Sequence, residues 1–192
     1  MLATLMAASL ALAPEVEVLG GYLAGGSGDP KAIALSLRVG ADFDDLVTVS
    51  GLLLGVAGNE GRYTSGAYAG RVDPSGMTAW AALMEGRLHT SGSEQLYLGG
   101  ALGIGKLATW QCVDCTETAP LYGHPALTLH GSTGIRVMPP SWDGFTLGAQ
   151  VAMTYWQGQE DPPNLASAQP WQTRAAPRLT WALLAAVGYR WP

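Results

Sequence analysis

Residues 178–191 read Arg-Leu-Thr-Trp-Ala-Leu-Leu-Ala-Ala-Val-Gly-Tyr-Arg-Trp, and this stretch decides the fold. Every second side chain from Leu179 to Trp191 is aliphatic or aromatic, whereas the alternate positions include both arginines. A period of two residues predicts a β-strand, because successive side chains point to opposite faces of a sheet. On the first face the aromatic rings lie toward both ends, with aliphatic groups between them. A strand that crosses a bilayer needs rings at the two interfaces and hydrocarbon at mid-depth.

The composition agrees with a chain that lies in lipid. Charged residues make up 13% of the sequence, half of the roughly 25% found in ordinary soluble domains, and the mean hydropathy is +0.16. No run reaches the roughly 20 apolar residues of a membrane-spanning helix, and the apolar run at 46–58 is rich in Gly, Val and Thr. A closed β-barrel is the other structure that satisfies every backbone polar group in lipid, and the 26 glycines suit its curved strands.

Alternation predicts eight strands, at residues 15–24, 31–43, 46–57, 77–90, 94–108, 126–138, 145–157 and 178–191. Short connections alternate with the longer links 59–76, 109–125 and 158–177. Bacterial single-chain barrels have an even number of strands, with tight periplasmic turns and long extracellular loops. The sequence therefore predicts an all-β fold, an eight-stranded antiparallel up-and-down transmembrane β-barrel.

This pattern, with a closing strand that ends in aromatic residues, resembles the small bacterial outer-membrane barrels of the OmpA/OmpX type. Pro192 follows the last aromatic residue, where that family usually ends on the aromatic residue itself. The resemblance implies a location in the bacterial outer membrane, contact with outer-membrane lipid and lipopolysaccharide, and a monomer. No cofactor is expected. The net charge of −5 disfavours a nucleic-acid partner, because phosphate binding needs concentrated Lys and Arg.

The face predicted to meet lipid carries two aromatic belts and no charge until Lys106, near a strand end. If the chain enters from the periplasm, the inner rim holds Phe43, Phe145, Tyr189 and Trp191, and the outer rim holds Tyr22, Trp80, Tyr155 and Trp181. In the third strand Leu52, Leu54 and Val56 break phase with the valines before them. A β-bulge near Gly51 is the predicted cause.

The opposite face carries the charges and is predicted to line the lumen: Glu17, Arg38, Asp42, Glu85, Arg87, His89, Arg136 and Arg190. A soluble lipocalin-like barrel would instead hold its charges outside. Under the assumed topology these side chains crowd into the periplasmic half, where the arginines should pair with the carboxylates and plug the barrel. A charge-lined conduction path is the alternative, although eight strands leave little room for one.

One interpretation of the outer half of the lumen is an apolar and roomy interior, because small residues point into it: Ala32, Ala34, Ala79, Ala81, Ala101, Gly103, Gly105 and Ala152. In architecture this resembles lipid A palmitoyltransferase, an eight-stranded barrel whose interior takes an acyl chain. We prefer the other interpretation, in which the small residues simply let a narrow barrel close.

One fragment, His130-Gly131-Ser132, resembles the H-x-S element of outer-membrane lipid A 3-O-deacylases, in which His acts as base for a Ser nucleophile. Alternation points both side chains into the lumen, although such a site must reach the outer leaflet. The fragment also lies in the sixth predicted strand, well before the C-terminal region where that family carries it. We therefore expect lumen hydrogen bonding here and assign no catalytic residue.

Cys112 and Cys115 lie in the second of the long links. In an exported protein this spacing predicts a small loop disulfide. A metal site that adds Asp114 and His124 is the alternative, and the sequence offers no second Cys-x-x-Cys.

The first 13 residues are predicted to be a signal peptide, since an apolar stretch ends in Ala11-Leu12-Ala13, which fits the A-x-A cleavage pattern. A short buried helix is the alternative. Residues 14–192 would then form a single barrel domain.

The function predicted from the sequence is that of a non-enzymatic outer-membrane barrel whose extracellular loops serve a structural, surface-interaction or adhesion role. Two alternatives stay open: an outer-membrane enzyme of the lipid A deacylase or acyltransferase type, and a barrel that binds a small apolar ligand in the upper lumen. The sequence does not name a partner for the loops.

Overall fold

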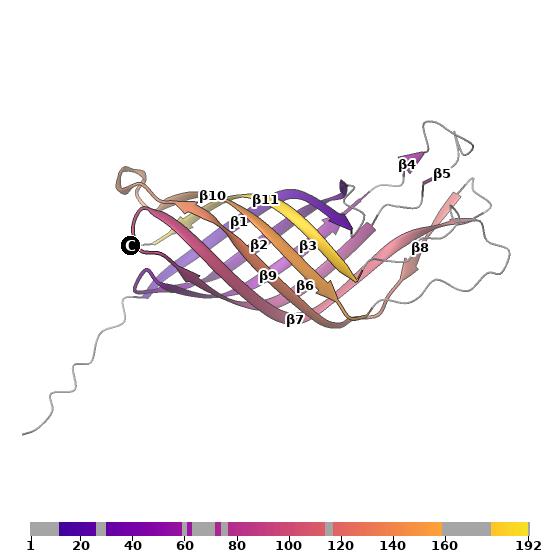
Figure 1. The fold of residues 1–192 in the computed structure, drawn as a ribbon, viewed down its shortest axis with the longest axis horizontal. Helices are drawn as coiled ribbons and strands as arrows, with labels where there is room; N and C mark the ends of the chain where they lie inside the picture. Colours follow the sequence, from indigo (N-terminus) through magenta and orange to yellow (C-terminus); the bar gives the residue numbers. More distant parts are fainter. Residues whose placement is uncertain are drawn as a thin grey trace, which may run out of the picture.

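Eight antiparallel strands close into a barrel in this computed structural model (Figure 1). The structure describes residues 12–25, 30–58, 61–62, 72–73, 77–113, 117–158 and 178–191. The barrel strands are β1 (Leu12–Gly25), β2 (Pro30–Phe43), β3 (Val47–Ala57), β6 (Met77–His89), β7 (Glu94–Val113), β9 (Ala126–Val137), β10 (Phe145–Trp156) and β11 (Leu179–Arg190). The shorter elements are β4 (Gly61–Arg62), β5 (Val72–Asp73), β8 (Glu117–Tyr122) and the 3-10 helix η1 (Pro140–Trp142). Among these residues no helix is long and apolar enough to cross a membrane.

Each barrel strand pairs with its neighbours in the chain, and the first and last strands complete the ring. β1 pairs with β11 from Glu15↔Arg190 to Gly25↔Thr180, so every barrel strand has a partner on both sides. The prediction of an eight-stranded antiparallel up-and-down transmembrane barrel is confirmed. The predicted strand ends agree with the observed ones within three residues, except at the end of β7.

The connections sort to the two ends of the barrel. The turns β2–β3, β6–β7 and β9–β10 lie together at one end with the C-terminus, which we call the short-turn end (Figure 1). We call the opposite end the loop end. There β7 continues to Val113 and pairs with β8, from Ala108↔Tyr122 to Val113↔Glu117. Part of the predicted loop 109–125 is therefore a β-hairpin, because Thr, Trp, Val and Tyr in these segments favour strand pairing.

The N-terminal end of β1 overlaps the predicted signal peptide. Leu12 pairs with Phe43 and Ala13 pairs with Asp42, so the sheet register begins inside the range 1–13. Residues 1–11 lie outside the described part of the chain. Cleavage after Ala13 stays a prediction, and it would remove these first two register positions.

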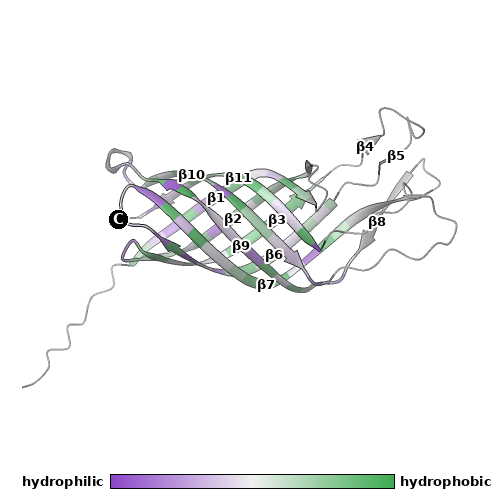
Figure 2. Cartoon of the chain, viewed as in Figure 1, coloured by the Kyte–Doolittle hydropathy of each residue, from purple (hydrophilic) through white to green (hydrophobic). Residues whose placement is uncertain are grey.

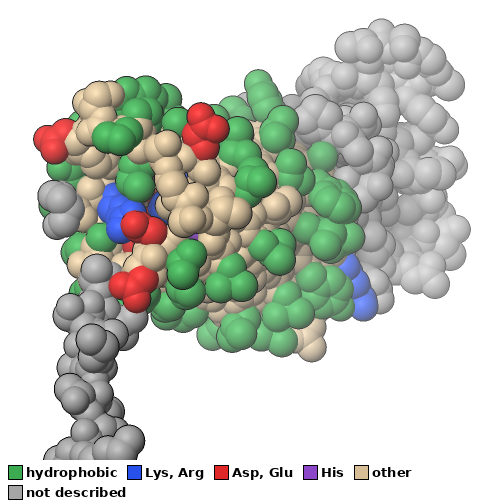
Figure 3. Space-filling model, turned by 60° about the vertical axis from the view of Figure 1, so that its left-hand side comes forward, with side chains coloured by type: hydrophobic (Ala, Val, Ile, Leu, Met, Phe, Trp, Pro, Cys, Tyr) green, Lys and Arg blue, Asp and Glu red, His purple; other side chains and the backbone are tan. Residues whose placement is uncertain are grey.

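The outer wall of the barrel is apolar. Side chains alternate between exposed and buried along the strands, as in the unbroken pattern of β3, and the exposed set includes Leu98 at 66%, Leu88 at 62% and Leu183 at 62%. Hydrophobic residues recur along the barrel strands (Figure 2). They cover the visible wall, whereas most of the charged side chains in view gather at the mouth of the short-turn end (Figure 3). A wall of this kind matches the hydrocarbon of a bilayer.

The predicted bulge near Gly51 is wrong. The register between β2 and β3 runs without a shift from Ile33↔Ala57 to Phe43↔Val47. Leu52, Leu54 and Val56 point into the lumen and are buried. The strand is apolar on both faces because these three side chains join the buried aliphatic cluster of the lumen, so the pattern needs no change of phase.

Two glycines of β7 test this sorting of faces. A Cβ added at the inward Gly103 would lie 2.1 Å from the backbone oxygen of Ala82, whereas one added at the outward Gly100 would meet nothing within 4 Å. We expect Gly103→Val to block folding, because the clash involves backbone, and Gly100→Val to fold normally. The folded fraction in detergent micelles, read from heat-modifiable gel migration, measures both. Equal folded fractions for the two variants would contradict the assignment.

Candidate functional site

The lumen of the short-turn half holds a cluster of charged side chains. All eight residues that the sequence assigns to it occupy inward strand positions: Glu17, Arg38, Asp42, Glu85, Arg87, His89, Arg136 and Arg190. The first seven are buried, and the Arg190 side chain keeps 14% exposure. Glu15 is also buried there. The sequence analysis missed it, although its position two residues before Glu17 places it on the same face.

Arg38 on β2 connects four strands. Its Nε donates to Glu85 Oε2 at 2.5 Å and its Nη2 donates to Glu85 Oε1 at 3.1 Å, which makes a bidentate pair. Its Nη1 donates to Glu17 Oε2, and its Nη2 also donates to Gln150 Oε1 at 3.3 Å. A guanidinium held by two parallel bonds is fixed in orientation as well as in charge. Arg38 therefore links β1, β2, β6 and β10 across the lumen.

Arg87 on β6 bridges the two glutamates of β1. Its Nη2 donates to Glu15 Oε1, and its Nη1 donates to Glu17 Oε2 at 3.3 Å. Its guanidinium carbon lies 5.2 Å from the centre of the Tyr97 ring, within the range of a cation–π contact. The Tyr97 hydroxyl in turn donates to Gln150 Oε1 at 2.8 Å. Tyr97 and Gln150 thus add neutral support that the sequence analysis did not anticipate.

Arg136 on β9 holds the part of the cluster nearer the turns. Its Nη1 donates to Glu15 Oε2 at 2.5 Å, its Nη2 donates to Asp42 Oδ2 at 3.0 Å, and its Nε donates to Gln95 Oε1 at 2.9 Å. Asp42 Oδ2 also lies 3.7 Å from Arg190 Nη1. Arg190 pairs in addition with Asp45, in the turn between β2 and β3. The cluster therefore ends at the barrel mouth.

These contacts form one chain of alternating sign across five strands: Glu85, Arg38, Glu17, Arg87, Glu15, Arg136, Asp42, Arg190 and Asp45. Inside the lumen four arginines face four carboxylates, so the formal charges cancel. Buried charges are tolerated when they are paired and hydrogen-bonded, and removing one partner leaves a costly bare charge. We call this set the lumen charge chain.

Polar residues beside the charge chain include the His130–Ser132 fragment. Ser132 Oγ donates to Glu85 Oε1 at 3.2 Å, and His130 Nδ1 lies 2.9 Å from Thr154 Oγ1. His130 Nε2 has no hydrogen-bond partner among the described residues, so it does not activate Ser132. Both side chains are buried in the lumen, away from the lipid that surrounds the wall. His130 and Ser132 therefore contribute hydrogen bonds that support the lumen structure.

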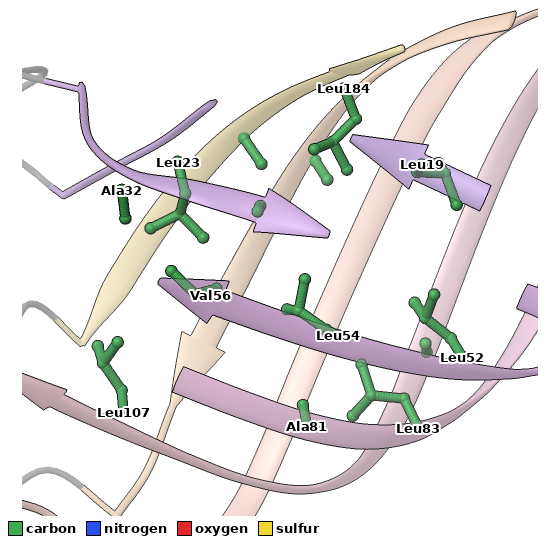
Figure 4. Close-up of a cluster of buried hydrophobic side chains, with 14 of the residues drawn as sticks. Leu19, Leu23, Ala32, Leu52, Leu54, Val56, Ala81, Leu83, Leu107 and Leu184 are labelled. Atoms are coloured by element: carbon green, nitrogen blue, oxygen red, sulfur yellow. The ribbon is translucent and has the colours of Figure 1, made fainter. Parts of the chain in front are cut away.

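The loop half of the lumen is filled by aliphatic side chains. Figure 4 shows Leu19, Leu23, Leu52, Leu54, Val56, Leu83, Leu107 and Leu184 converging on the barrel interior together with Ala32 and Ala81. The apolar character agrees with the sequence, and the buried aliphatic set favours the narrow, packed interior over the roomy one. Large residues from β1, β3, β6, β7 and β11 occupy the space that the alanines and glycines leave. We call this set the lumen apolar cluster.

The predicted belt residues lie on the outer wall. At the short-turn end Tyr189 contacts Phe145 and Trp191 edge to face, with ring centres 5.3 and 5.0 Å apart. Phe43 at the same end is partly buried. Toward the loop end the exposed rings are Tyr22, Trp80, Tyr155 and Trp181.

The predicted loop disulfide cannot be placed. Only the backbone of Cys112 is described, at the end of β7, and Cys115 and Asp114 lie outside the described residues. In the part of the chain that the structure covers, no group of three or more His, Cys, Asp or Glu side chains could hold a metal ion.

No family model matches the sequence, and no curated protein matches it. Among solved structures, Neisserial surface protein A is 10% identical, with 93% of this chain and 96% of that chain covered and a TM-score of 0.56. The N-terminal β-barrel domain of Pseudomonas aeruginosa OprF is 10% identical over 93% and 97%, with a TM-score of 0.53. Ail, the attachment invasion locus protein of Yersinia pestis, is 10% identical over 94% and 97%, with a TM-score of 0.52. The fold is that of a small outer-membrane β-barrel.

Removing one member of the charge chain should destabilise the barrel. We expect Arg38→Met to lower the free energy of unfolding by about 3–5 kcal/mol, because Glu85 would stay buried without its bidentate partner and Glu17 would keep only Arg87. Arg178→Met changes an exposed arginine outside the lumen and should cost under about 0.5 kcal/mol. Urea titration of the refolded barrel, followed by tryptophan fluorescence, measures both changes.

A double variant separates charge from packing. Adding Glu85→Met to Arg38→Met removes the bare carboxylate and should restore part of the lost stability. If Arg38→Met lowered the free energy of unfolding no more than Arg178→Met does, the charge chain would not stabilise the fold.

Proposed function

We propose that this chain is a non-enzymatic protein of the bacterial outer membrane whose barrel anchors surface loops. The observation that carries the proposal is the filled lumen behind an apolar wall. The charge chain occupies one half of the interior and the apolar cluster the other, so the barrel serves as an anchor. Segments that connect strands outside the barrel are then the parts free to meet a partner.

The wall supports the proposed location. Exposed leucines, valines and isoleucines cover the strands, and aromatic rings lie toward both ends, as lipid-spanning strands require. The solved structures of similar fold include a Neisserial surface protein and an attachment invasion locus protein. Their names support a surface role for this chain by analogy of fold alone.

The alternatives receive less support from the geometry. A lipid-modifying enzyme would need its reacting groups at the outer leaflet, whereas His130 and Ser132 face the lumen and bind Thr154 and Glu85. An apolar ligand in the upper lumen would have to displace the leucines of the apolar cluster. The anchor is therefore the function that the interior fits best.

Epitope insertion on intact cells tests the location and the orientation. We expect an epitope inserted after residue 165, in the β10–β11 link, to bind antibody on intact cells. An epitope inserted at Gly92, in the β6–β7 turn, should bind only after permeabilisation, because short turns face the periplasm. Labelling of the Gly92 epitope on intact cells would reverse the orientation. Recovery of the protein in the soluble fraction, without heat-modifiable migration, would refute the membrane location.

The filled lumen also predicts the absence of conduction. In planar lipid bilayers the refolded barrel should show no steady single-channel current, because the charge chain and the apolar cluster both block the path. Porins of 16–18 strands keep an aqueous channel and provide the positive control. A steady current that Arg38→Met alters would instead establish the conduction path along the charged side chains.

A further inference from the structure

A pocket of about 490 Å³ opens at the short-turn end of the barrel. It lies at the ends of β1 and β11, and residues of the β2–β3, β6–β7 and β9–β10 connections also line it. Its larger apolar lining residues are Leu12, Met138, Pro139, Pro140 and Trp191. The ionisable side chains among its described lining residues are Asp45, Asp143 and Arg190. A pocket of this size, mostly apolar and with a few polar groups, is typical of a small-molecule site.

Backbone hydrogen bonds hold the frame of the pocket. Arg190 N donates to Gly144 O at 2.9 Å, which ties the β9–β10 connection to the end of β11. Met138 N donates to Ser93 O at 2.7 Å, which ties the same connection to the β6–β7 turn. The pocket is therefore preformed, and a ligand spends little of its binding free energy on ordering it.

The pocket carries an excess of negative charge. Arg190 pairs with Asp42 and Asp45, and it already belongs to the neutral set of four arginines and four carboxylates in the lumen. Asp45 and Asp143 lie outside that set and add two negative charges. Acidic side chains are visible around this mouth (Figure 3). The described lysines and arginines outside the lumen set lie at or toward the loop end: Lys31, Arg62, Lys106 and Arg178. An excess of carboxylates in a concave site attracts a cation.

A buried acceptor lies beside the pocket. Asp42 is fully buried, and its Oδ1 has no hydrogen-bond partner among the described residues. Its Oδ2 lies 3.7 Å from Nη1 of Arg190, a lining residue, and Asp42 pairs in register with Ala13, another lining residue. A buried acceptor without a donor costs free energy, and an ammonium group brings three N–H donors. This observation favours a ligand rich in N–H groups.

The two aspartates of the pocket come from connections that β1 and β11 separate. Asp45 lies in the turn after β2 and Asp143 in the connection before β10, and the order around the barrel is β2, β1, β11, β10. Three strand spacings of 4.8 Å give a separation of about 14 Å along the sheet. Leu12 and Trp191, at the ends of the two strands between, supply apolar surface over this distance. Two carboxylates joined by apolar surface complement a chain of methylene groups that carries several ammonium groups.

We propose that this pocket binds a linear polyamine, with ammonium groups at Asp45 and Asp143 and the methylene chain along Leu12 and Trp191. In the proposed orientation the short-turn end faces the periplasm, so the ligand comes from that compartment. The site adds a binding function to a barrel whose interior is filled.

Equilibrium dialysis of labelled spermidine against the refolded full chain in a non-ionic detergent tests the proposal. The parent should bind spermidine saturably at one site. Asp143→Asn removes one charge and should weaken binding about fivefold. Asparagine tolerates the φ of 49° at this position, so the connection keeps its shape. Ser93→Phe fills the pocket and should weaken binding about tenfold.

Each variant has a matched control. Asp44→Asn removes a charge at a φ of 54° in the β2–β3 turn, and Asp44 does not line the pocket. Ser91→Phe adds the same ring in the β6–β7 turn, outside the lining. Both variants should bind spermidine like the parent. Equal weakening by Asp44→Asn and Asp143→Asn would overturn the proposal, since binding would then follow the general negative charge of the mouth.

Two competitors test the chemistry of the ligand. Octanediol is a neutral chain of similar length and should not displace spermidine, because it carries no ammonium group. Mg²⁺ carries charge without a methylene chain and should displace spermidine only at large excess. Displacement by Mg²⁺ at equal concentration would mean that the carboxylates bind any cation, and would also overturn the proposal.

Heat-modifiable migration of every variant shows whether it has folded. A folded parent that binds no spermidine would refute the pocket site and leave the surface anchor standing. Reversal of the epitope result would change only the side of the membrane from which the polyamine comes.

Discussion

In hydrocarbon no water is present to bond a free backbone N–H or C=O, and a spanning structure must satisfy all of these groups itself. This chain does so through the pairing of β1 with β11, which leaves the barrel sheet without an edge. Closure with only eight strands makes the interior narrow, so inward side chains must fill it. That closure explains why each strand has an apolar outer face and a packed inner face. It also sets the position of each charge.

The narrow interior is divided by chemistry. Near the turns, four arginines and four carboxylates form the lumen charge chain, and neutral partners such as Gln95 and Gln150 accept the remaining guanidinium bonds. Near the loops, leucines fill most of the lumen, and the buried threonines Thr128, Thr154 and Thr180 lie among them. Charges can lie in so confined a space because each one meets an opposite charge from another strand. The interior thus stabilises the barrel.

The outside offers two kinds of surface. At the loop end β7 and β8 extend a hairpin beyond the last register position of β9, and the long links leave from the same end. On the wall, an apolar groove crosses β2, β3, β6 and β7. A packed barrel presents both surfaces while its interior stays closed.

The sequence by itself determined the eight barrel strands, the faces of all but the third, and the charged set in the lumen except Glu15, because a period of two residues is a local property. Alternation in stretches such as 178–191 therefore predicted both the all-β fold class and the barrel topology. Because Glu15 lies two residues before Glu17, the same alternation would also have placed Glu15 in the lumen. Only the tertiary structure decided which charges meet. Arg38 and Glu85 stand 47 positions apart, and Arg136 and Glu15 stand 121 apart, so ring closure sets their contacts. It also decided that Leu52 and Leu54 continue an unbroken strand, since only a closed barrel gives them an apolar interior to fill.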